Sequence, residues 1–131
     1  MLVVDASVVA PAVADGGEDG RHYRQRLRAE QPVAPDLLRV EVLSVLRRQH
    51  HLGGLDAEEV EAAVEDLLDL DLVVYPTGPL LRRAWELRNN VTAYDACYVA
   101  LAEALECTLL TADARLSRAA GVTCDIEVIR A

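Results

Sequence analysis

Four acidic side chains stand where carboxylates could act together in chemistry. Asp5 and Asp113 each follow a short apolar run and precede a stretch that favours a helix. Asp95 begins a helical stretch that is apolar nearly all the way round, and Glu41 lies on an amphipathic one. At about 100° per residue, Glu41 falls beside the apolar face of its helix. An unpaired carboxylate beside a buried face is costly, so this side chain needs a partner.

Each of the four acids also has a purely structural interpretation. Asp5 and Asp113 could be the N-caps of the helices that follow them. Asp95 completes Thr92-Ala93-Tyr94-Asp95, which has the spacing of a capping box with Asp in place of Glu or Gln. Glu41 could pair with an arginine. Four unrelated caps and ion pairs nevertheless explain the set less economically than one shared site does.

Convergence of the four carboxylates would create strong mutual repulsion, which a hard divalent cation relieves. Mg²⁺ and Mn²⁺ prefer oxygen ligands, and no histidine obviously joins the group, because all three lie in polar segments. A cation held by carboxylates can activate water and stabilise negative charge on a phosphodiester oxygen. We therefore expect a Mg²⁺ or Mn²⁺ site formed by Asp5, Glu41, Asp95 and Asp113.

The charge balance bears on the substrate. The chain has 22 acidic and 13 basic residues and a formal net charge of −9, whereas a protein that binds nucleic acid by charge attraction alone should be basic. A bound cation would attract phosphate in spite of this balance. Arginines could add a local basic rim, in the stretch from Arg21 to Arg28 or at Arg47-Arg48. A solvated helix face with ion pairs is the simpler explanation of any one of them.

The elements that must position these acids alternate along the chain. Apolar runs bounded by breaking residues predict strands at Leu2–Val4, Leu72–Tyr75, Thr108–Thr111 and Ile126–Ile129. A short extended segment is expected over Pro32–Asp36. Helical stretches lie at 7–14, 18–29, 37–51, 57–70, 79–88, 94–105 and 114–119. This alternation predicts an α/β domain with a mainly parallel sheet, in which ligands bind beyond the carboxyl ends of the strands.

Length and composition narrow the class of protein further. The 131 residues, 52% of them hydrophobic, predict one domain over residues 1–131 with a real core. The three cysteines lack CxxC spacing, which disfavours zinc and disulfide frameworks and fits a reducing cytoplasm. The first apolar run is too short for a signal peptide, and no run approaches a membrane span. We therefore expect a cytoplasmic protein without a membrane segment.

Four segments occur in order at characteristic spacings. They are Val3-Val4-Asp5-Ala6-Ser7; Pro35 through Val40-Glu41-Val42 to Leu46-Arg47-Arg48; Tyr94-Asp95-Ala96 through Tyr98-Val99-Ala100-Leu101-Ala102; and Leu110-Thr111-Ala112-Asp113 through Leu116. No single segment is specific to one protein family, whereas the four segments together, in this order and at these spacings, are. In this pattern, which spans nearly the whole chain, the sequence resembles the PIN-domain family and, within it, the VapC-type toxins of bacterial toxin–antitoxin pairs.

This resemblance implies a PIN-like three-layer domain, with a central and mainly parallel sheet flanked by helices, and a metal-dependent endoribonuclease activity. It implies that Mg²⁺ or Mn²⁺ is held by Asp5, Glu41, Asp95 and Asp113, with Ser7 and Thr111 as supporting hydroxyls. Members of the family commonly form homodimers, and a cognate VapB-like antitoxin inhibits them by covering the active-site groove. All four acids are present, so nothing indicates an inactive copy.

Two other classes of protein remain open. A phosphorylated receiver-like signalling domain has a similar length and an acidic pocket beside its first strand, but it uses adjacent acids there and a late lysine. Here Val4 and Ala6 flank Asp5, and all 13 basic residues are arginine. The second alternative is a non-catalytic, dimerising α/β module, which would bind no divalent cation and would tolerate Asp95→Asn.

Overall fold

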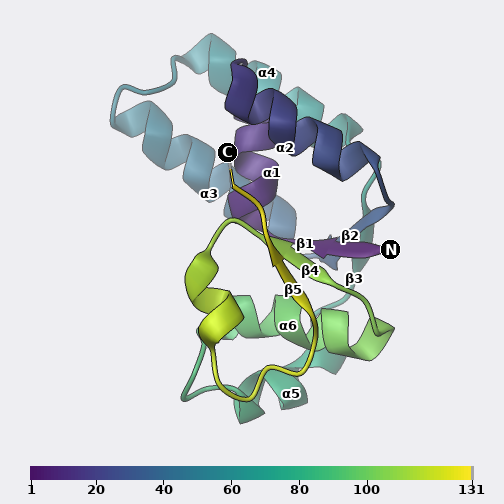
Figure 1. The fold of residues 1–131 in the computed structure, drawn as a ribbon. Coiled ribbons are helices and arrows are strands. Elements are labelled where there is room, and N and C mark those ends of the chain that lie inside the picture. The colour runs from purple at the N-terminus through teal and green to yellow at the C-terminus, as the bar shows by residue number, and fades with distance from the viewer. Residues whose placement is uncertain (131) are drawn as a thin grey trace.

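A computed structural model describes residues 1–130, in which five short strands alternate with helices (Figure 1). The strands are β1 (Leu2–Val4), β2 (Pro32–Pro35), β3 (Val73–Tyr75), β4 (Leu109–Thr111) and β5 (Ile126–Val128). The α-helices are α1 (Ala6–Ala14), α2 (Glu18–Arg28), α3 (Leu38–His51), α4 (Ala57–Asp69), α5 (Leu81–Glu86) and α6 (Ala93–Leu105). Two 3₁₀ helices are η1 (Gly78–Leu80) and η2 (Ala114–Arg118).

The strands form one sheet in the order β3-β2-β1-β4-β5, and each neighbouring pair is parallel. Helices α1 to α4 lie on one side of this sheet, while α5 and α6 lie on the other (Figure 1). The expected three-layer α/β architecture is therefore confirmed, and the sheet is parallel throughout.

Three elements differ from their expected form, and one of them is the helix expected over 79–88, which consists of η1 followed by α5. The extended segment at Pro32–Asp36 is the strand β2, paired with both β1 and β3. Its prolines stand at the first and last positions, where a missing backbone N–H disturbs the hydrogen-bond ladder least. The stretch after Asp113 forms the 3₁₀ helix η2 and not an α-helix, as is common for a piece of only one or two turns.

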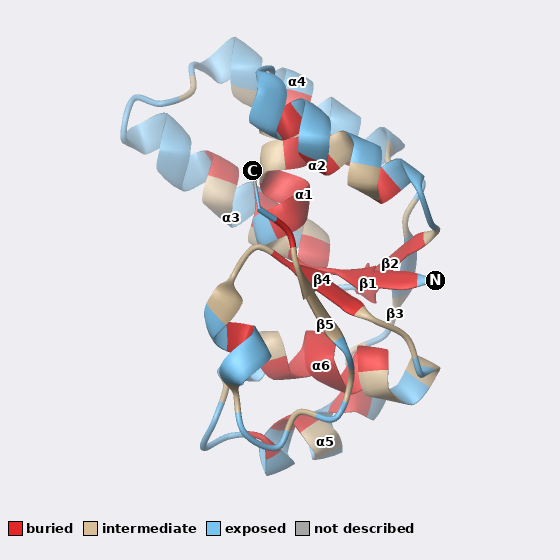
Figure 2. Ribbon diagram, viewed as in Figure 1, coloured by how far each residue is buried: buried red, intermediate tan, exposed pale blue. Residues whose placement is uncertain are grey.

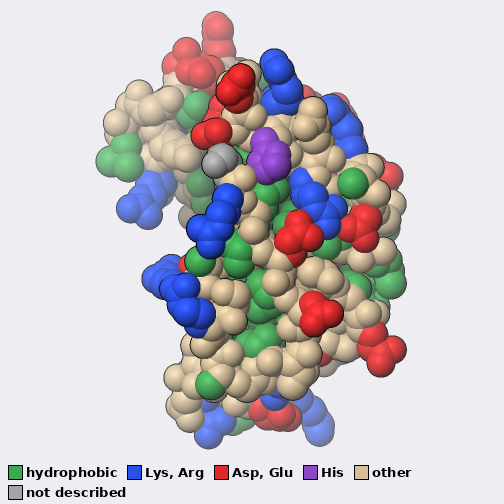
Figure 3. Space-filling view, in the orientation of Figure 1, with side chains coloured by type: hydrophobic (Ala, Val, Ile, Leu, Met, Phe, Trp, Pro, Cys, Tyr) green, Lys and Arg blue, Asp and Glu red, His purple; other side chains and the backbone are tan. Residues whose placement is uncertain are grey.

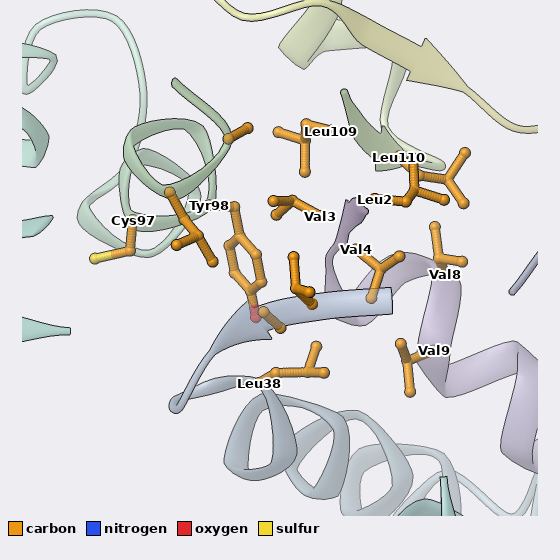
Figure 4. Packing of buried hydrophobic residues seen from close by; sticks show 14 of the residues in the cluster. Leu2, Val3, Val4, Val8, Val9, Leu38, Cys97, Tyr98, Leu109 and Leu110 are labelled. Atoms are coloured by element: carbon orange, nitrogen blue, oxygen red, sulfur yellow. The ribbon is translucent and has the colours of Figure 1, made fainter. Parts of the chain in front are cut away.

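The core fills both sides of the sheet (Figure 2). Every residue of β1 and β4 is buried, as expected for strands covered on both faces. On α6, each residue from Ala96 to Ala102 is buried, which confirms the expectation of a central apolar helix. Tyr98 of α6 lies among these side chains, and its hydroxyl end points towards α3 near Leu38 (Figure 4). In the part of the chain that the structure describes, no helix has the length and apolarity to cross a membrane.

One ion-pair network fastens α5 and α6 to the loop before β5. The Arg83 guanidinium donates to Glu103 through Nε at 2.7 Å and Nη2 at 3.1 Å, and to the Gly121 carbonyl at 2.6 Å. Thr123 donates to the same carboxylate through its backbone N–H and its hydroxyl. These hydrogen bonds lower the pKa of Glu103 to about 2. The bonds from Arg83 have the largest effect, and the bonds from Thr123 lower the pKa further.

Glu103→Gln is expected to lower the free energy of unfolding by about 2 kcal/mol at neutral pH, because hydrogen bonds to a charged group are the stronger ones. The folded-state pKa of Glu103 lies below its ordinary value of 4.5. The stabilisation is therefore present above that value and declines as the pH falls towards the folded-state pKa. Urea unfolding of both proteins from neutral pH to about pH 3 should show a difference that shrinks with acidification.

The matched control is Glu86→Gln. Glu86 also pairs with Arg83, at 3.2 Å, but its side chain is 63% exposed, so its loss should cost less than about 0.5 kcal/mol. Equal destabilisation by the two substitutions would contradict the role given to Glu103.

Candidate functional site

Asp5 and Thr111 meet where the strand order of the sheet reverses. From β1 the chain builds β2 and β3 on one side, then returns to place β4 and β5 on the other. Val4 is in register with Leu110, so the next residues, Asp5 and Thr111, lie side by side at the carboxyl edge. In an open parallel sheet such a switch point is where ligands bind.

Asp5 is only 6% exposed, and both of its carboxylate oxygens accept hydrogen bonds from other residues of the protein. Its Oδ1 accepts from the backbone N–H of Ser7 at 3.1 Å and from the Ser7 hydroxyl, and its Oδ2 accepts from Thr111 Oγ1 at 2.6 Å. The same hydroxyls accept from the backbone N–H groups of Ala112 and Asp113. Asp5 is thus the N-cap of α1 and is also tied, through two hydroxyls, to the loop that carries Asp113.

Glu41 approaches from the first turn of α3. It borders the buried face of this helix and is itself half-buried. The Tyr98 hydroxyl of α6 donates to Glu41 Oε1 at 2.5 Å. Among the ion pairs of the described residues, none involves Glu41. The interpretation of Glu41 as the partner of an arginine is therefore wrong: a neutral hydroxyl binds it, and its charge is not cancelled.

Asp95 and Asp113 stand at the beginnings of α6 and η2. The Asp95 backbone N–H donates to Thr92 Oγ1 at 3.1 Å, so Thr92 caps α6, but only this half of the expected capping box forms. Asp113 caps η2 by accepting from the Arg115 backbone. Its two oxygens also accept from Arg115 Nε at 3.0 Å and Nη2 at 2.8 Å. The Asp95 carboxylate is therefore left out of the cap, and Asp113 is held by a local arginine.

The electrostatics of the four acids show that they sense one another. Burial raises the pKa of Asp5, Glu41 and Asp95. The charge of Asp95 adds to the rise at Asp5 and Glu41, and the charge of Asp113 adds to the rise at Asp95. Asp113 differs, because hydrogen bonding to Arg115 lowers its pKa. The pKa shifts therefore link Asp95 with each of the other three acids.

The donor set fits a hard divalent cation in its chemistry. All four side chains offer carboxylate oxygens, and three of them have pKa values raised by burial and by one another's charge. A bound cation would relieve that repulsion. Within residues 1–130, however, no three acidic, histidine or cysteine side chains are grouped closely enough to hold an ion together. The assignment of the four acids as ligands therefore remains a prediction.

The arginines expected at a basic rim divide into two groups. Arg24 donates to the Ala12 and Asp15 carbonyls, and Arg26 pairs with Glu127 at 2.7 Å and with Glu30 at 2.9 Å. These two have structural roles. On the face drawn in Figure 3, basic side chains gather on both sides of a notch at the left of the view, over α3 and η2. Basic side chains also lie over α2 in the same view, so the basic side chains of this face are not confined to α3 and η2.

Two hollows differ in their relation to the acids. One of about 470 Å³ lies between the α5–α6 loop and η2 and is lined in part by Asp95 and Asp113. A larger one, about 790 Å³, lies between the carboxyl-terminal ends of α2 and α4, beside the start of β2, and none of the four acids lines it. The smaller hollow is therefore the one that can receive a molecule acted on at this site.

Two residues of the site escaped the sequence argument for specific reasons. Tyr98 follows Asp95 by three residues on an apolar helix, and a buried hydroxyl normally finds a hydrogen-bond partner. The sequence therefore indicates that the Tyr98 hydroxyl has a hydrogen-bond partner, although only the fold identifies this partner as Glu41. Arg115 lies two residues after Asp113, a spacing that fixes no contact by itself.

Comparisons with known proteins identify the family of this chain. Residues 2–122 match the family model of the PIN domain. The chain is 42% identical to ribonuclease VapC9 of Mycobacterium tuberculosis over 98% of each chain. It is 43% identical to ribonuclease VapC1 of the same organism, over 98% of this chain and 97% of the relative. The fold is similar to the crystal structure of the M. tuberculosis sarcin–ricin-loop-cleaving toxin VapC20, with a TM-score of 0.71 and 17% identity over 94% of this chain and 97% of that one.

Tyr98→Phe is expected to weaken Mn²⁺ binding by roughly 10- to 100-fold, the usual loss when a group that orients a metal ligand is removed. The hydroxyl bond to Glu41 opposes the rise in that carboxyl's pKa, so its loss also favours the protonated form. Titration calorimetry at neutral pH measures the change.

The control for this substitution is Tyr23→Phe, because Tyr23 is a buried tyrosine of α2 remote from the four acids. It should bind Mn²⁺ as the unaltered protein does. Unchanged Mn²⁺ affinity in a folded Tyr98→Phe protein would remove Glu41 from the ligand set.

Proposed function

Because the chain belongs to the PIN-domain family, we propose that it is a metal-dependent endoribonuclease that hydrolyses RNA phosphodiester bonds and acts as the toxin of a toxin–antitoxin pair. Relatives at 42% and 43% identity carry the name ribonuclease. On the chain itself, one observation carries the proposal: the Ser7 and Thr111 hydroxyls tie the buried Asp5 carboxylate at the switch point to the loop that carries Asp113, and Asp113 lines an open hollow together with Asp95.

We assign the cofactor as Mg²⁺ or Mn²⁺ and its ligands as Asp5, Glu41, Asp95 and Asp113. When bound, such an ion supplies an activated water and stabilises negative charge on a phosphodiester oxygen. The ion also reconciles the net charge of −9 with a polyanionic substrate, because it turns the acidic edge into a phosphate-binding position.

The chain's own residues would orient and tune these ligands. Hydrogen bonds from Ser7 and Thr111 favour the ionised form of Asp5 against the effect of burial, and they fix its orientation. Tyr98 does the same for Glu41 from the opposite layer. Arg115 holds Asp113 and is 85% exposed, so its guanidinium can also meet a substrate phosphate.

The alternative of a receiver-like phosphorylated domain has less support. Its phosphoacceptor must be open to a phosphodonor, whereas Asp5 is 6% exposed and both its oxygens are bound by hydroxyls. A non-catalytic module gives no reason for Asp5 and Glu41 to be bound by hydroxyls and to have no arginine partner among the ion pairs of the described residues.

Asp95→Asn is expected to abolish RNA cleavage while the protein stays folded, because it removes one carboxylate ligand but leaves Thr92 bonded to the backbone N–H of residue 95. The loss should be at least about 100-fold, as for other losses of catalytic electrostatics. Cleavage of total cellular RNA with Mg²⁺ or Mn²⁺, followed by mapping of the cut ends, measures the effect. EDTA should stop the unaltered protein.

Asp71→Asn is the matched control, since Asp71 is an exposed acid between α4 and β3 and its loss changes the net charge equally. In EDTA, Asp95→Asn should melt no lower than the unaltered protein, because it relieves like-charge repulsion. Cleavage at the normal rate by Asp95→Asn, or in excess EDTA, would refute the metal mechanism.

We further propose a VapB-like antitoxin partner and a homodimeric assembly. Exposed apolar side chains stand on either side of Glu41 along α3: Val40 is 71% exposed and Leu43 is 47% exposed. A partner segment that packed on them would bury apolar surface and would cover the approach to Glu41 at the same time. This gives an inhibitor an apolar anchor beside the acids.

Co-expression with a VapB-like antitoxin that binds this chain is expected to yield a complex that cleaves no RNA. Val40→Ser should raise the inhibitor concentration needed by about tenfold, as for the loss of an apolar anchor, and should leave uninhibited cleavage intact. Inhibition curves for purified proteins measure the shift.

The homodimer is tested separately. Light scattering of the chain alone should give twice the mass of one copy.

Leu68→Ser serves as the control, because Leu68 is 59% exposed on α4 and not on α3. If Val40→Ser left the inhibition curve where it was, α3 would not be the anchor, and the mass of a single copy would rule out the dimer.

A further inference from the structure

The hollow beside Asp95 and Asp113 has the composition of a nucleotide subsite. Its volume of about 470 Å³ lies within the range of small-molecule sites in proteins. One end holds the two acids, and the rest is formed by the α5–α6 loop and η2. A molecule bound here would therefore lie next to the atoms that the four acids act upon.

Two neighbouring amides form the polar wall of this hollow. Asn89 and Asn90 are both exposed and line it, and neither side chain forms a hydrogen bond with the described residues. An amide offers two donors and an acceptor, the combination that reads the edges of bases. A Cβ at Gly121 would come within 3.4 Å of the Asn90 amide nitrogen, so the glycine leaves this side chain its space.

The opposite wall is apolar. Leu116 of η2 is 4% exposed, and half-buried Val91 and Ala119 lie near it. A lining that combines apolar side chains with amides suits a base, whose ring faces are apolar and whose edge is polar. A phosphate or metal ion alone would gain nothing from such a wall.

Two arginines frame the hollow. Arg88 lines it, and its guanidinium carbon lies 4.4 Å from the ring centroid of Trp85, which is 67% exposed. No carboxylate pairs with Arg88 among the described residues, so its charge is available to a phosphate. Arg115, beside Asp113, supplies a second cation at the end nearest the acids.

We propose that this hollow binds the nucleotide next to the scissile bond of single-stranded RNA, with Asn89 and Asn90 on the base edge and Arg88 on a phosphate. The inference rests on the proposed function, since the acids define where the bond lies. A base can enter the hollow only when it is unpaired and unstacked, so an RNA duplex serves as the control for binding by Asn89, Asn90 and Arg88.

Trp85 is the one tryptophan of the chain, so its fluorescence reports on Arg88 without interference. Titrating full-length Asp5→Asn protein in Mg²⁺ with short homopolymers of A, C, G or U should change the Trp85 emission and saturate. An RNA duplex of the same length should give no saturable change. Unaltered protein in EDTA provides the same measurement should Asp5→Asn fold poorly.

Substitution separates the roles of the side chains. Arg88→Ala should weaken binding of every homopolymer by about tenfold, as for the loss of a charged hydrogen bond. Asn89→Ala with Asn90→Ala should weaken binding of the preferred homopolymer most and should move the positions cut in cellular RNA. Gln25→Ala, an exposed amide on α2, should change neither.

The outcomes distinguish this inference from the proposed function. If the protein cuts RNA in a metal-dependent way but Trp85 emission is unmoved and the double asparagine variant cuts at the same positions, the subsite is wrong and the function stands. Saturable binding of single strands with loss on Arg88→Ala supports the subsite even if no cleavage is found. Equal binding of duplex and single strand would overturn it.

Discussion

The burial of carboxylates at the carboxyl edge of the sheet is the constraint that the rest of this structure must accommodate. Asp5 is almost fully buried, and the charge of Asp95 opposes its ionisation. Keeping such charges together costs folding free energy, so the surrounding elements must be strongly stabilised by other means. Two buried apolar strands, β1 and β4, and the fully apolar middle of α6 provide that stability. The sheet can therefore hold the acids in place, although they repel one another.

The partners of these acids are neutral donors. Ser7 and Thr111 bind Asp5, and Tyr98 binds Glu41. An arginine in either place would be a better electrostatic partner, but it would cancel the charge that a cation needs and would compete with that cation. Hydroxyl donors fix the orientation of a carboxylate and leave its charge. The exception is Asp113, whose arginine is local and exposed and can turn away at little cost in packing.

The sequence predicts those features of this molecule that depend on local patterns, and it does not predict contacts between segments that are distant along the chain. The buried strands β1 and β4 and the apolar helix α6 can be predicted from the apolar runs of the sequence. Because parallel strands end at the same edge of a sheet, this prediction then places Asp5 near Asp113. Glu41 was identified by its position beside an apolar face, but its contact with Tyr98 depends on how α3 packs across the sheet from α6, which no local pattern encodes. The hollow at Asn89 and Asn90 was missed because exposed amides carry no periodic signal. Only the fold brings them beside η2.

The distribution of arginine explains how an acidic chain can recognise a polyanion. Arg26 and Arg83 are fixed in ion pairs with Glu127 and Glu103, and these carboxylates offset their charges. Arg88 and Arg115, by contrast, lie at the hollow beside Asp95 and Asp113. With a net charge of −9, long-range attraction cannot steer RNA to the surface. In the proposed function, recognition of RNA then depends on short-range contacts at the edge of the sheet and not on the net charge of the chain.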